Sequence, residues 1–209
     1  MKIVYDNKKS ELDILENTSR ADLHVVSGEG AKNKLIHADN LSALKALLDD
    51  YARRIDLIYI DPPFATNGYF KIGEKRTNTI SNSNDDEIAY SDTLIGAEFL
   101  EFLRERLVFL RELMSDRASI YLHIDYKIGH YVKLIMDEVF GRENFRNDIT
   151  RIKCNPKNFQ RKGYGNIKDL ILFYSKSTNP TWNHPTMPHS EEEEGRLFKK
   201  VDKDGRKYT

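Results

Sequence analysis

Short apolar runs alternate with longer amphipathic segments along the middle of this chain. The apolar runs have the length of strands, whereas the amphipathic segments repeat their apolar residues at the spacing of one helix face. Because strands and helices alternate, the pattern predicts an α/β fold in which helices cover the faces of a sheet. Strands are expected at residues 35–38, 56–60, 119–124, 147–153 and 170–174, and helices at 41–48, 94–114 and 126–140.

Composition excludes several classes of protein. The 209 residues, 39% of them hydrophobic, suffice for one compact domain. Because 33 Lys and Arg balance 33 Asp and Glu, a charged partner such as nucleic acid must be recognised by a local patch. The single cysteine, Cys154, cannot form an internal disulfide. The first residues lack the apolar core of a signal peptide, and every apolar run is far shorter than the roughly 18 residues that span a bilayer. We therefore expect a cytoplasmic protein without membrane contact.

The distribution of polar residues divides the chain into three parts. Residues 1–34 are polar and lack a sustained period, which predicts an irregular N-terminal arm with little core. Residues 35–177 hold the expected strands and helices. They are interrupted at 65–92 by a long stretch rich in Asn, Ser and charge, where we expect a mobile loop. Residues 178–209, which include a run of glutamates, are expected to form a solvated polar tail.

The apolar strand at 56–60 runs into the tetrapeptide Asp61-Pro62-Pro63-Phe64. Proline lacks a backbone N–H, so the strand must end at Asp61. Ligands of α/β sheets bind beyond the carboxyl ends of the strands, and Asp61 lies at such an end. The alternative is purely structural: the carboxylate caps a turn, the prolines end the strand and the phenylalanine packs in the core.

The same four residues fit the methylation of an exocyclic amino group on a nucleic-acid base. The lone pair of that nitrogen is delocalised into the ring, so a catalyst has to localise it. The Asp61 carboxylate can accept one N–H of the amine, and the Pro62 carbonyl, held by two locked φ angles, can accept the other. Phe64 offers a flat apolar face for a base that has rotated out of its duplex.

The sequence around this motif resembles the amino-methylating DNA methyltransferases. The stretch LIHADN, a helix and then IDLIYIDPPFATNG are similar to the β-type, circularly permuted adenine-N6 enzymes of restriction-modification systems, whose motif is Asp-Pro-Pro-Tyr or Asp-Pro-Pro-Phe. The resemblance continues through FLEFLRERLVFLRELM, SIYLHID, MDEVFGRENFRNDI and LILFYSK, and covers roughly residues 35–177. Asp61 favours adenine within this family, because serine at its position is typical of cytosine-N4 enzymes.

The resemblance implies a Rossmann-like, S-adenosylmethionine-dependent fold with a mostly parallel sheet and helices on both faces. It implies transfer of a methyl group from S-adenosylmethionine to the N6 amino group of adenine in a specific sequence of double-stranded DNA, with Asp61, Pro62, Pro63 and Phe64 as catalytic residues. Residues 35–177 would be the catalytic domain, and the tail would lead toward a target-recognition region. A second copy of the chain or a restriction subunit is the expected protein partner.

The resemblance also implies a cofactor site at Asp39, Asn40 and Asp61, with Asp39 near the adenine or ribose of S-adenosylmethionine. An N-cap for the following helix explains Asp39 equally well. The family's glycine-rich cofactor loop, Phe-x-Gly-x-Gly, has no match in the sequence. The Gly-x-Gly at 28–30, a few residues before the strand expected at 35–38, lacks a following helix; it is weak evidence and is expected to be a loop.

The missing glycine pattern has a consequence for the sheet. In the family's sheet, the strand that carries the glycine loop and a neighbouring strand lie between the Asp39 strand and the Asp61 strand. We therefore expect an incomplete sheet, belonging to the N-terminal portion of a larger enzyme. The alternative from another class is a catalytically silent DNA-binding piece that needs a partner region to hold the cofactor.

Residues 141–177 form a basic sector in a chain of zero net charge. The sector contains nine Lys and Arg and three Asp and Glu. DNA phosphates favour such a surface, and the interleaved Asn, Gln and aromatic residues can contact base edges or fill a vacated stack. The alternative is a solvated, charged loop. The residues expected to contact DNA are Arg151, Lys153, Lys157, Arg161 and Lys162.

His123 and Asp125 have the spacing His-x-Asp at the end of the strand expected at 119–124. Together with Asp61 they could be read as the beginnings of a metal site, which would suggest a metal-dependent nuclease. Two candidate ligands on one strand end are a weak signal, and the family that the chain resembles uses no metal. We therefore expect both residues to be satisfied or exposed polar groups, with no metal bound.

Overall fold

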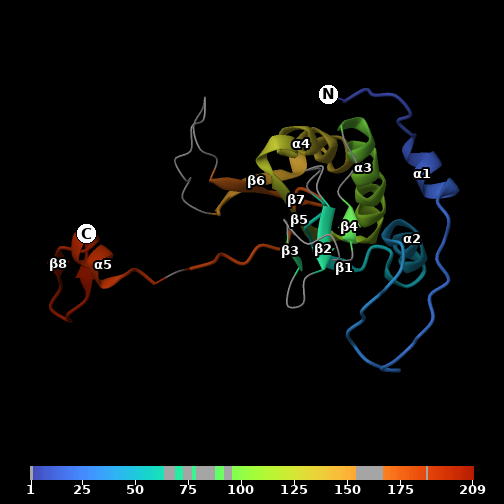
Figure 1. Cartoon of the computed structure of the whole chain (residues 1–209). Helices are drawn as coiled ribbons and strands as arrows, with labels where there is room; N and C mark the ends of the chain where they lie inside the picture. Colours follow the sequence, from blue (N-terminus) through green and yellow to red (C-terminus); the bar gives the residue numbers. More distant parts are fainter. Residues whose placement is uncertain are drawn as a thin grey trace.

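The structure is a computed structural model that describes residues 2–63, 69–72, 77–78, 88–91, 96–153, 167–186 and 188–209 (Figure 1). Helices and strands alternate along the part of the chain that holds the site, as the sequence predicts. The principal elements are α2 (Asn40–Tyr51), β1 (Ile55–Ile60), α3 (Gly96–Leu113), β5 (Met114–Asp125), α4 (Tyr126–Phe140), β6 (Phe145–Ile152) and β7 (Lys168–Ser175). A 3₁₀ turn, η1 (Arg142–Asn144), links α4 to β6.

The main sheet has the strand order β1-β5-β7-β6. Strands β1 and β5 are parallel, whereas β7 is antiparallel to both of its neighbours, β5 and β6. It follows that β1, β5 and β6 run in one direction and that β7 alone runs against them. The predicted α/β class with most strands in one direction is confirmed. The carboxyl ends of β1, β5 and β6 and the amino end of β7 therefore meet at one edge of the sheet.

The hydrophobic core lies between the sheet and helices α3 and α4. On β5 the alternate residues Ile120, Leu122 and Ile124 are fully buried in it. Helix α3 contributes residues such as Phe99 and Leu107 at the predicted helical spacing, which gives it one apolar face. The side chains of β1 that point away from the core, among them Leu57 and Tyr59, remain largely exposed.

Helix α4 begins and ends at the predicted residues. Asp125 is its N-cap, since its Oδ1 accepts a hydrogen bond from the backbone N–H of Lys127 at 2.8 Å. Gly141 ends the helix with a φ of 88°, a conformation that L-residues with a side chain rarely adopt. The strand β5 that precedes α4 extends from Met114 and is longer than the predicted segment 119–124.

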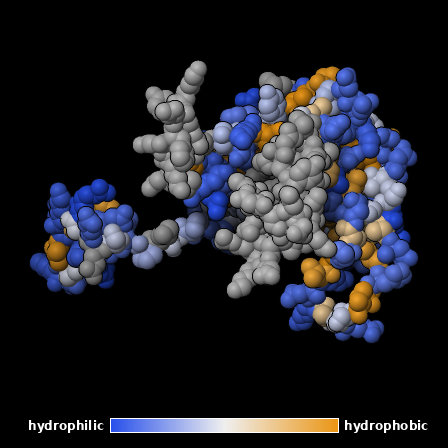
Figure 2. Space-filling view, in the orientation of Figure 1, coloured by the Kyte–Doolittle hydropathy of each residue, from blue (hydrophilic) through white to orange (hydrophobic). Residues whose placement is uncertain are grey.

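The strand predicted at residues 35–38 is wrong. The structure forms no strand there, and Leu35 is fully exposed. A strand needs a neighbour that accepts and donates backbone hydrogen bonds, and none of the described strands pairs with this segment. Residues 35–38 belong to the connection between α2 and the preceding helix, α1 (Glu11–Asn17), which Figure 1 places at the lower right of the molecule. Figure 2 shows hydrophobic residues gathered in the same place.

The expectation that residues 1–34 are irregular and hold little core is wrong for α1. Ser10 is the N-cap of this helix, and Ile14 is buried in the core. Ion pairs from the same segment reach α3, where Lys9 meets Glu105 and Arg111 meets Glu11. One buried residue in a seven-residue helix leaves too little periodicity to be recognised in a sequence.

The residues outside the main sheet contain further local structure. Within the stretch 65–92, the strands β2 (Tyr69–Ile72), β3 (Thr77–Asn78) and β4 (Ile88–Ser91) form a small antiparallel sheet in the order β3-β2-β4. The rest of that stretch, whose mobility was predicted, lies outside the described residues. The polar tail holds α5 (Glu191–Leu197) with a capping box at Ser190 and Glu193, and a hairpin of β8 (Lys200–Val201) and β9 (Lys207–Tyr208).

None of the described helices is long and apolar enough to cross a membrane.

Candidate active site at the carboxyl edge of the sheet

Asp61 is the first residue after β1, at the edge where three strands end. Its side chain is 57% exposed, so a ligand can reach the carboxylate. Pro62 and Pro63 follow it and are half-buried. The two prolines end the strand as the sequence predicts, and Phe64 lies outside the described residues.

His123 lies beside Asp61 on the neighbouring strand. The parallel register pairs Ile60 with Leu122, so the next residues, Asp61 and His123, emerge side by side. The Nδ1 atom of His123 is 3.1 Å from Oδ1 of Asp61, within hydrogen-bonding distance. Unlike Asp61, His123 is buried, with only 7% of its surface exposed.

The other ring nitrogen of His123 faces Asp169 on β7. His123 Nε2 is 3.3 Å from Asp169 Oδ2, and Asp169 is almost completely buried. Lys153 pairs with Asp169 and also reaches Asp125 Oδ2 at 3.3 Å, while Arg151 Nη1 lies 3.2 Å from Asp169 Oδ2. Four elements of the same edge are thereby joined into one ionic cluster.

The charges in this cluster stabilise one another. Burial alone would raise the pKa of Asp169, but its close contacts with Lys153 and His123 outweigh burial and hold that pKa below its usual range. Burial likewise acts to lower the pKa of Lys153, and contacts with Asp169 and Asp125 outweigh it and raise that pKa above its usual value. A buried carboxylate without such partners would be very costly, so the cluster keeps Asp169 ionised.

The described residues do not support a metal site. They contain no group of three or more His, Cys, Asp or Glu side chains arranged to hold a metal ion. Asp125, one of the three candidate ligands, instead caps α4 and contacts Lys153. Asp125 is thus satisfied by the contacts that it makes, while the role of His123 and the absence of a bound metal stay predictions.

Asp39 lies at the start of α2, and the structure shows it as an N-cap. Its Oδ1 accepts hydrogen bonds from the backbone N–H and the hydroxyl of Ser42, both at 3.0 Å. The Ser42 backbone N–H is the main cause that lowers the pKa of the Asp39 carboxyl. Asn40 accepts a hydrogen bond from Arg106 on α3 at 2.7 Å, and Arg106 stacks on Phe102.

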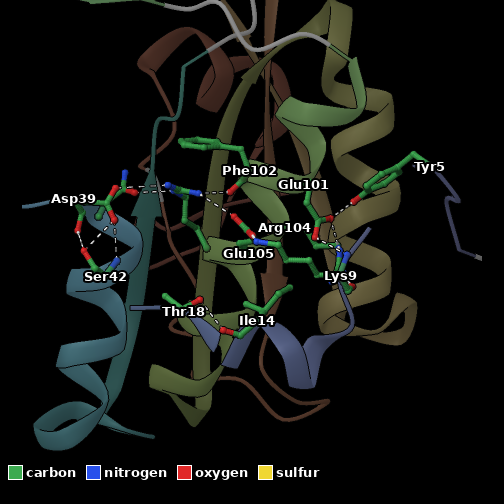
Figure 3. A network of polar contacts seen from close by, with 12 residues as sticks. Tyr5, Lys9, Ile14, Thr18, Asp39, Ser42, Glu101, Phe102, Arg104 and Glu105 are labelled. Carbon is green, nitrogen blue, oxygen red and sulfur yellow. Dashed lines mark hydrogen bonds and ion pairs between the residues drawn. The ribbon is translucent and has the colours of Figure 1, made fainter. Parts of the chain in front are cut away.

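Figure 3 shows Asp39 beside Ser42 at the start of α2. The cap leaves the Asp39 carboxylate largely exposed, with its Oδ2 4.0 Å from Arg106. An exposed carboxylate with one anchored oxygen fits a partner that offers an amino or hydroxyl hydrogen, such as the adenine or ribose of a nucleoside. The capping explanation is therefore confirmed, and the predicted cofactor contact at Asp39 and Asn40 stays a prediction.

The same view shows how the segment before α1 is anchored to α3 (Figure 3). Tyr5 donates to Glu101 at 2.5 Å, and the buried Arg104 donates to Glu101 and to the backbone carbonyl of Lys9. A hollow of about 360 Å³ lies between α1 and the start of α2 and includes Asp39 and Ser42 in its lining. Sequence reasoning missed Arg104, because it reads as one more charge on the polar face of an amphipathic helix.

The predicted DNA contacts divide into two groups. Arg151 and Lys153 are described, and both are engaged with Asp169. Lys157, Arg161 and Lys162 lie outside the described residues. Contact of these five residues with DNA phosphate therefore stays a prediction.

The contact between Asp61 and His123 is the part of the site that sequence reasoning missed. The sequence pattern groups Asp61 with His123 only as a weak metal-site alternative, and it does not predict a direct contact between the two side chains. The signal that could have joined them is the expected adjacency of the two parallel strands, which places the residues at their carboxyl ends side by side.

Comparisons with known proteins identify the family of the chain. The family described as DNA methylase, N6_N4_Mtase, matches residues 55–209. The chain is 36% identical over 207 residues to the type II methyltransferase M.EcaI of Enterobacter cloacae, covering 96% of this chain and 43% of that protein. It is 28% identical over 167 residues to the StyLTI Mod subunit, a type III restriction-modification protein of Salmonella typhimurium, covering 73% of this chain and 25% of that protein. The chain thus spans less than half the length of these relatives.

Among solved structures, the M1.HpyAVI–SAM complex aligns with a TM-score of 0.46 and 15% identity, over 74% of this chain and 60% of that one.

Proposed function

The chain belongs to the DNA methylase family, and from this premise we propose that it carries the catalytic motif of an adenine-N6 DNA methyltransferase that uses S-adenosylmethionine. One observation carries the proposal. Asp61, the first residue of the Asp-Pro-Pro-Phe motif, presents an exposed carboxylate at the ligand-binding edge of the sheet, inside the segment that matches the family.

The chemistry of the motif supports amino methylation. In this proposal Asp61 accepts one N–H of the target amine and the Pro62 carbonyl accepts the other, which localises the nitrogen lone pair toward the incoming methyl group. The carboxylate also stabilises the positive charge that develops on nitrogen as the new bond forms. Phe64 would stack on the flipped base.

Adenine is the proposed target in preference to cytosine. The family name covers both N6 and N4 amino methylation, so membership alone leaves both bases open. The proposal for adenine depends on the resemblance, in which aspartate at the position of Asp61 accompanies adenine and serine accompanies cytosine.

S-adenosylmethionine is the proposed source of the methyl group, and Asp39, Asn40 and Asp61 are the residues proposed to hold it. When bound, the cofactor would supply an electrophilic methyl group. The exposed carboxylate of Asp39, fixed by Ser42, would accept a hydrogen from the adenine or ribose of the cofactor.

Double-stranded DNA is the proposed substrate, reached in the cytoplasm. Arg151, Lys153 and the other basic residues of the sector 141–177 would contact its phosphates. The relatives include Mod subunits of type III restriction-modification enzymes, which supports a restriction subunit as the proposed partner. A second copy of the chain is the alternative partner.

A nucleoside analysis tests the proposed function. The natural gene product that contains this chain is incubated with radiolabelled S-adenosylmethionine and duplex DNA, and the digested nucleosides are separated. We expect label in N6-methyladenine. Label in N4-methylcytosine would contradict the choice of base, and DNA that stays unlabelled across a library of sequences would contradict methyl transfer.

A second candidate function is a DNA-binding piece that cannot hold the cofactor by itself. The absence of a Phe-x-Gly-x-Gly pattern from the sequence favours it. One hydrogen bond from Asp39 contributes about 1 kcal/mol, against an association cost of several kcal/mol. We expect this 209-residue chain alone to bind S-adenosylmethionine weakly or not at all. Calorimetry that gave a one-to-one complex of micromolar affinity would show that these residues form a sufficient cofactor pocket.

A further inference from the structure

The Asp61 carboxylate must point in one direction if it is to accept a hydrogen from a target amine. Its own position does not fix it, because the residue follows the last residue of β1 and its side chain is more than half exposed. An exposed aspartate rotates freely about two side-chain bonds. A neighbouring group that binds one carboxylate oxygen would remove this freedom and leave the second oxygen for the substrate.

His123 has the properties of such a group. It lies on β5, a strand paired on both sides, and only 7% of its surface is exposed. Its Nδ1 approaches Oδ1 of Asp61 at 3.1 Å, so Oδ2 can accept an N–H of the target amine. A buried ring on a central strand is a far more rigid support than the turn that follows β1.

Asp169 fixes the orientation of the imidazole ring. It is 1% exposed, lies 3.3 Å from Nε2 and is itself held by Lys153 and Arg151. A carboxylate therefore lies on either side of the His123 ring, with Asp61 facing Nδ1 and Asp169 facing Nε2. Rotation of the ring would break a contact in the buried cluster, so the cluster holds the ring in the direction of Asp61.

We propose that His123 is a positioning residue that orients the Asp61 carboxylate and that Asp169, held by Lys153 and Arg151, orients His123. This inference rests on the proposed function, since it assigns His123 a purpose in amino methylation. It also gives Arg151 and Lys153 a role inside the protein in addition to the DNA contacts proposed for them. His123 itself does not touch the reacting atoms.

Three substitutions distinguish a His123 side chain that orients Asp61 from one that only fills space. In His123→Asn the side-chain amide takes the place of Nδ1 and can still donate to Asp61. In His123→Gln the amide takes the place of Nε2 and reaches Asp169 instead, and His123→Ala removes both contacts. His130, exposed on α4, provides the matched control His130→Asn.

The natural gene product is assayed for kcat and for KM with duplex DNA. We expect kcat to stay within about threefold of the unmodified protein in His123→Asn and to fall about 10- to 100-fold in His123→Gln and His123→Ala. KM for DNA should change less than about threefold in all three variants, and His130→Asn should change neither value. Equal losses of kcat in His123→Asn and His123→Gln would overturn the inference.

A measurement that needs no turnover tests the contact itself. The ¹⁵N resonance of His123 Nδ1 should shift when Asp61→Ala removes the carboxylate, while the His130 resonances stay in place. A His123 resonance that does not move overturns the inference even if the variants lose activity. If the unmodified protein methylates no adenine, the proposed function fails, and this measurement still decides whether His123 holds Asp61.

Discussion

Asp39 and Asp61 are both acidic residues that the sequence marks as functional, but different kinds of interaction hold them. Asp39 is fixed by its own helix, through Ser42 three residues later in the chain. Asp61 is contacted by His123, which lies on another strand, and through it by Asp169 on a third. The difference teaches that a local capping interaction can be inferred from neighbouring residues, whereas the contacts of a carboxylate at a strand end depend on tertiary structure.

The largest effect is expected at Asp61. Asp61→Ala in the natural gene product should reduce methyl transfer by about 10²- to 10³-fold, because it removes the acceptor that acts on the reacting amine. Affinity for duplex DNA should stay within a few-fold, since this carboxylate does not contact phosphate. Asp50→Ala, an exposed position on α2, is the control and should leave both values unchanged. Methylation at the unmodified rate by Asp61→Ala would remove Asp61 from the catalytic site.

A large loss of stability is expected when Asp169, the most deeply buried residue of the cluster, is replaced. Asp169→Asn should lower the free energy of unfolding by about 3 kcal/mol at pH 7, because Lys153 and Arg151 each lose a charged partner. The pKa of Asp169 is lowered in the folded protein, so the ionised group stabilises the fold above its ordinary pKa and this contribution is lost as the pH falls. The difference between the two proteins should therefore narrow below about pH 4.

Urea unfolding of both proteins at pH 7 and pH 3 measures this difference. Asp204→Asn, in the exposed tail, serves as the control and should leave the free energy of unfolding unchanged at both values of pH. A difference between Asp169→Asn and the unmodified protein that is the same at pH 7 and pH 3 would mean that the charge of Asp169 contributes nothing to the cluster.

Phe64 tests the part of the motif that lies outside the described residues. Phe64→Ala should weaken DNA binding and turnover by a stacking energy of about 1 to 3 kcal/mol, whereas Phe64→Tyr should be nearly silent because it offers the same ring face. A 2-aminopurine at the target position should brighten as it leaves the stack on binding. Unchanged fluorescence in fully bound DNA would count against base flipping.

The strands and helices around the site could be predicted because their patterns are local. The apolar run ending at Asp61 and the helix Tyr126–Phe140 each carry a stop signal in the sequence, proline in one case and Gly141 in the other. The strand expected at residues 35–38 carried the same apolar signal but failed, because a strand also needs a paired neighbour that the local sequence does not reveal.

The residues of the candidate site could be selected from the sequence by their place at strand ends. The contacts between them could not be predicted. The pairing of His123 with Asp61 requires the register of β1 on β5, and that of Asp169 with both Arg151 and Lys153 requires the antiparallel β6–β7 pair. The contacts of Arg151 and Lys153 with Asp169 could not be predicted because, in sequence, this buried partner lies 16 to 18 residues away and is indistinguishable from a surface acid.

The smallest effect is expected at Asp39, where two substitutions separate the cap from the cofactor contact. Asn is as good an N-cap as Asp, so Asp39→Asn should keep the stability of α2, whereas Asp39→Ala should lose about 1 kcal/mol of unfolding free energy. If Asp39 also accepts a hydrogen from S-adenosylmethionine through its charged carboxylate, both variants should weaken cofactor binding by a comparable few-fold factor, equivalent to about 1 kcal/mol. Calorimetry with the cofactor and urea unfolding measure the two quantities on the same proteins. Cofactor affinity that falls in Asp39→Ala but stays unchanged in Asp39→Asn would show that the carboxylate acts as a cap alone, because the charge would then be dispensable while the cap is not.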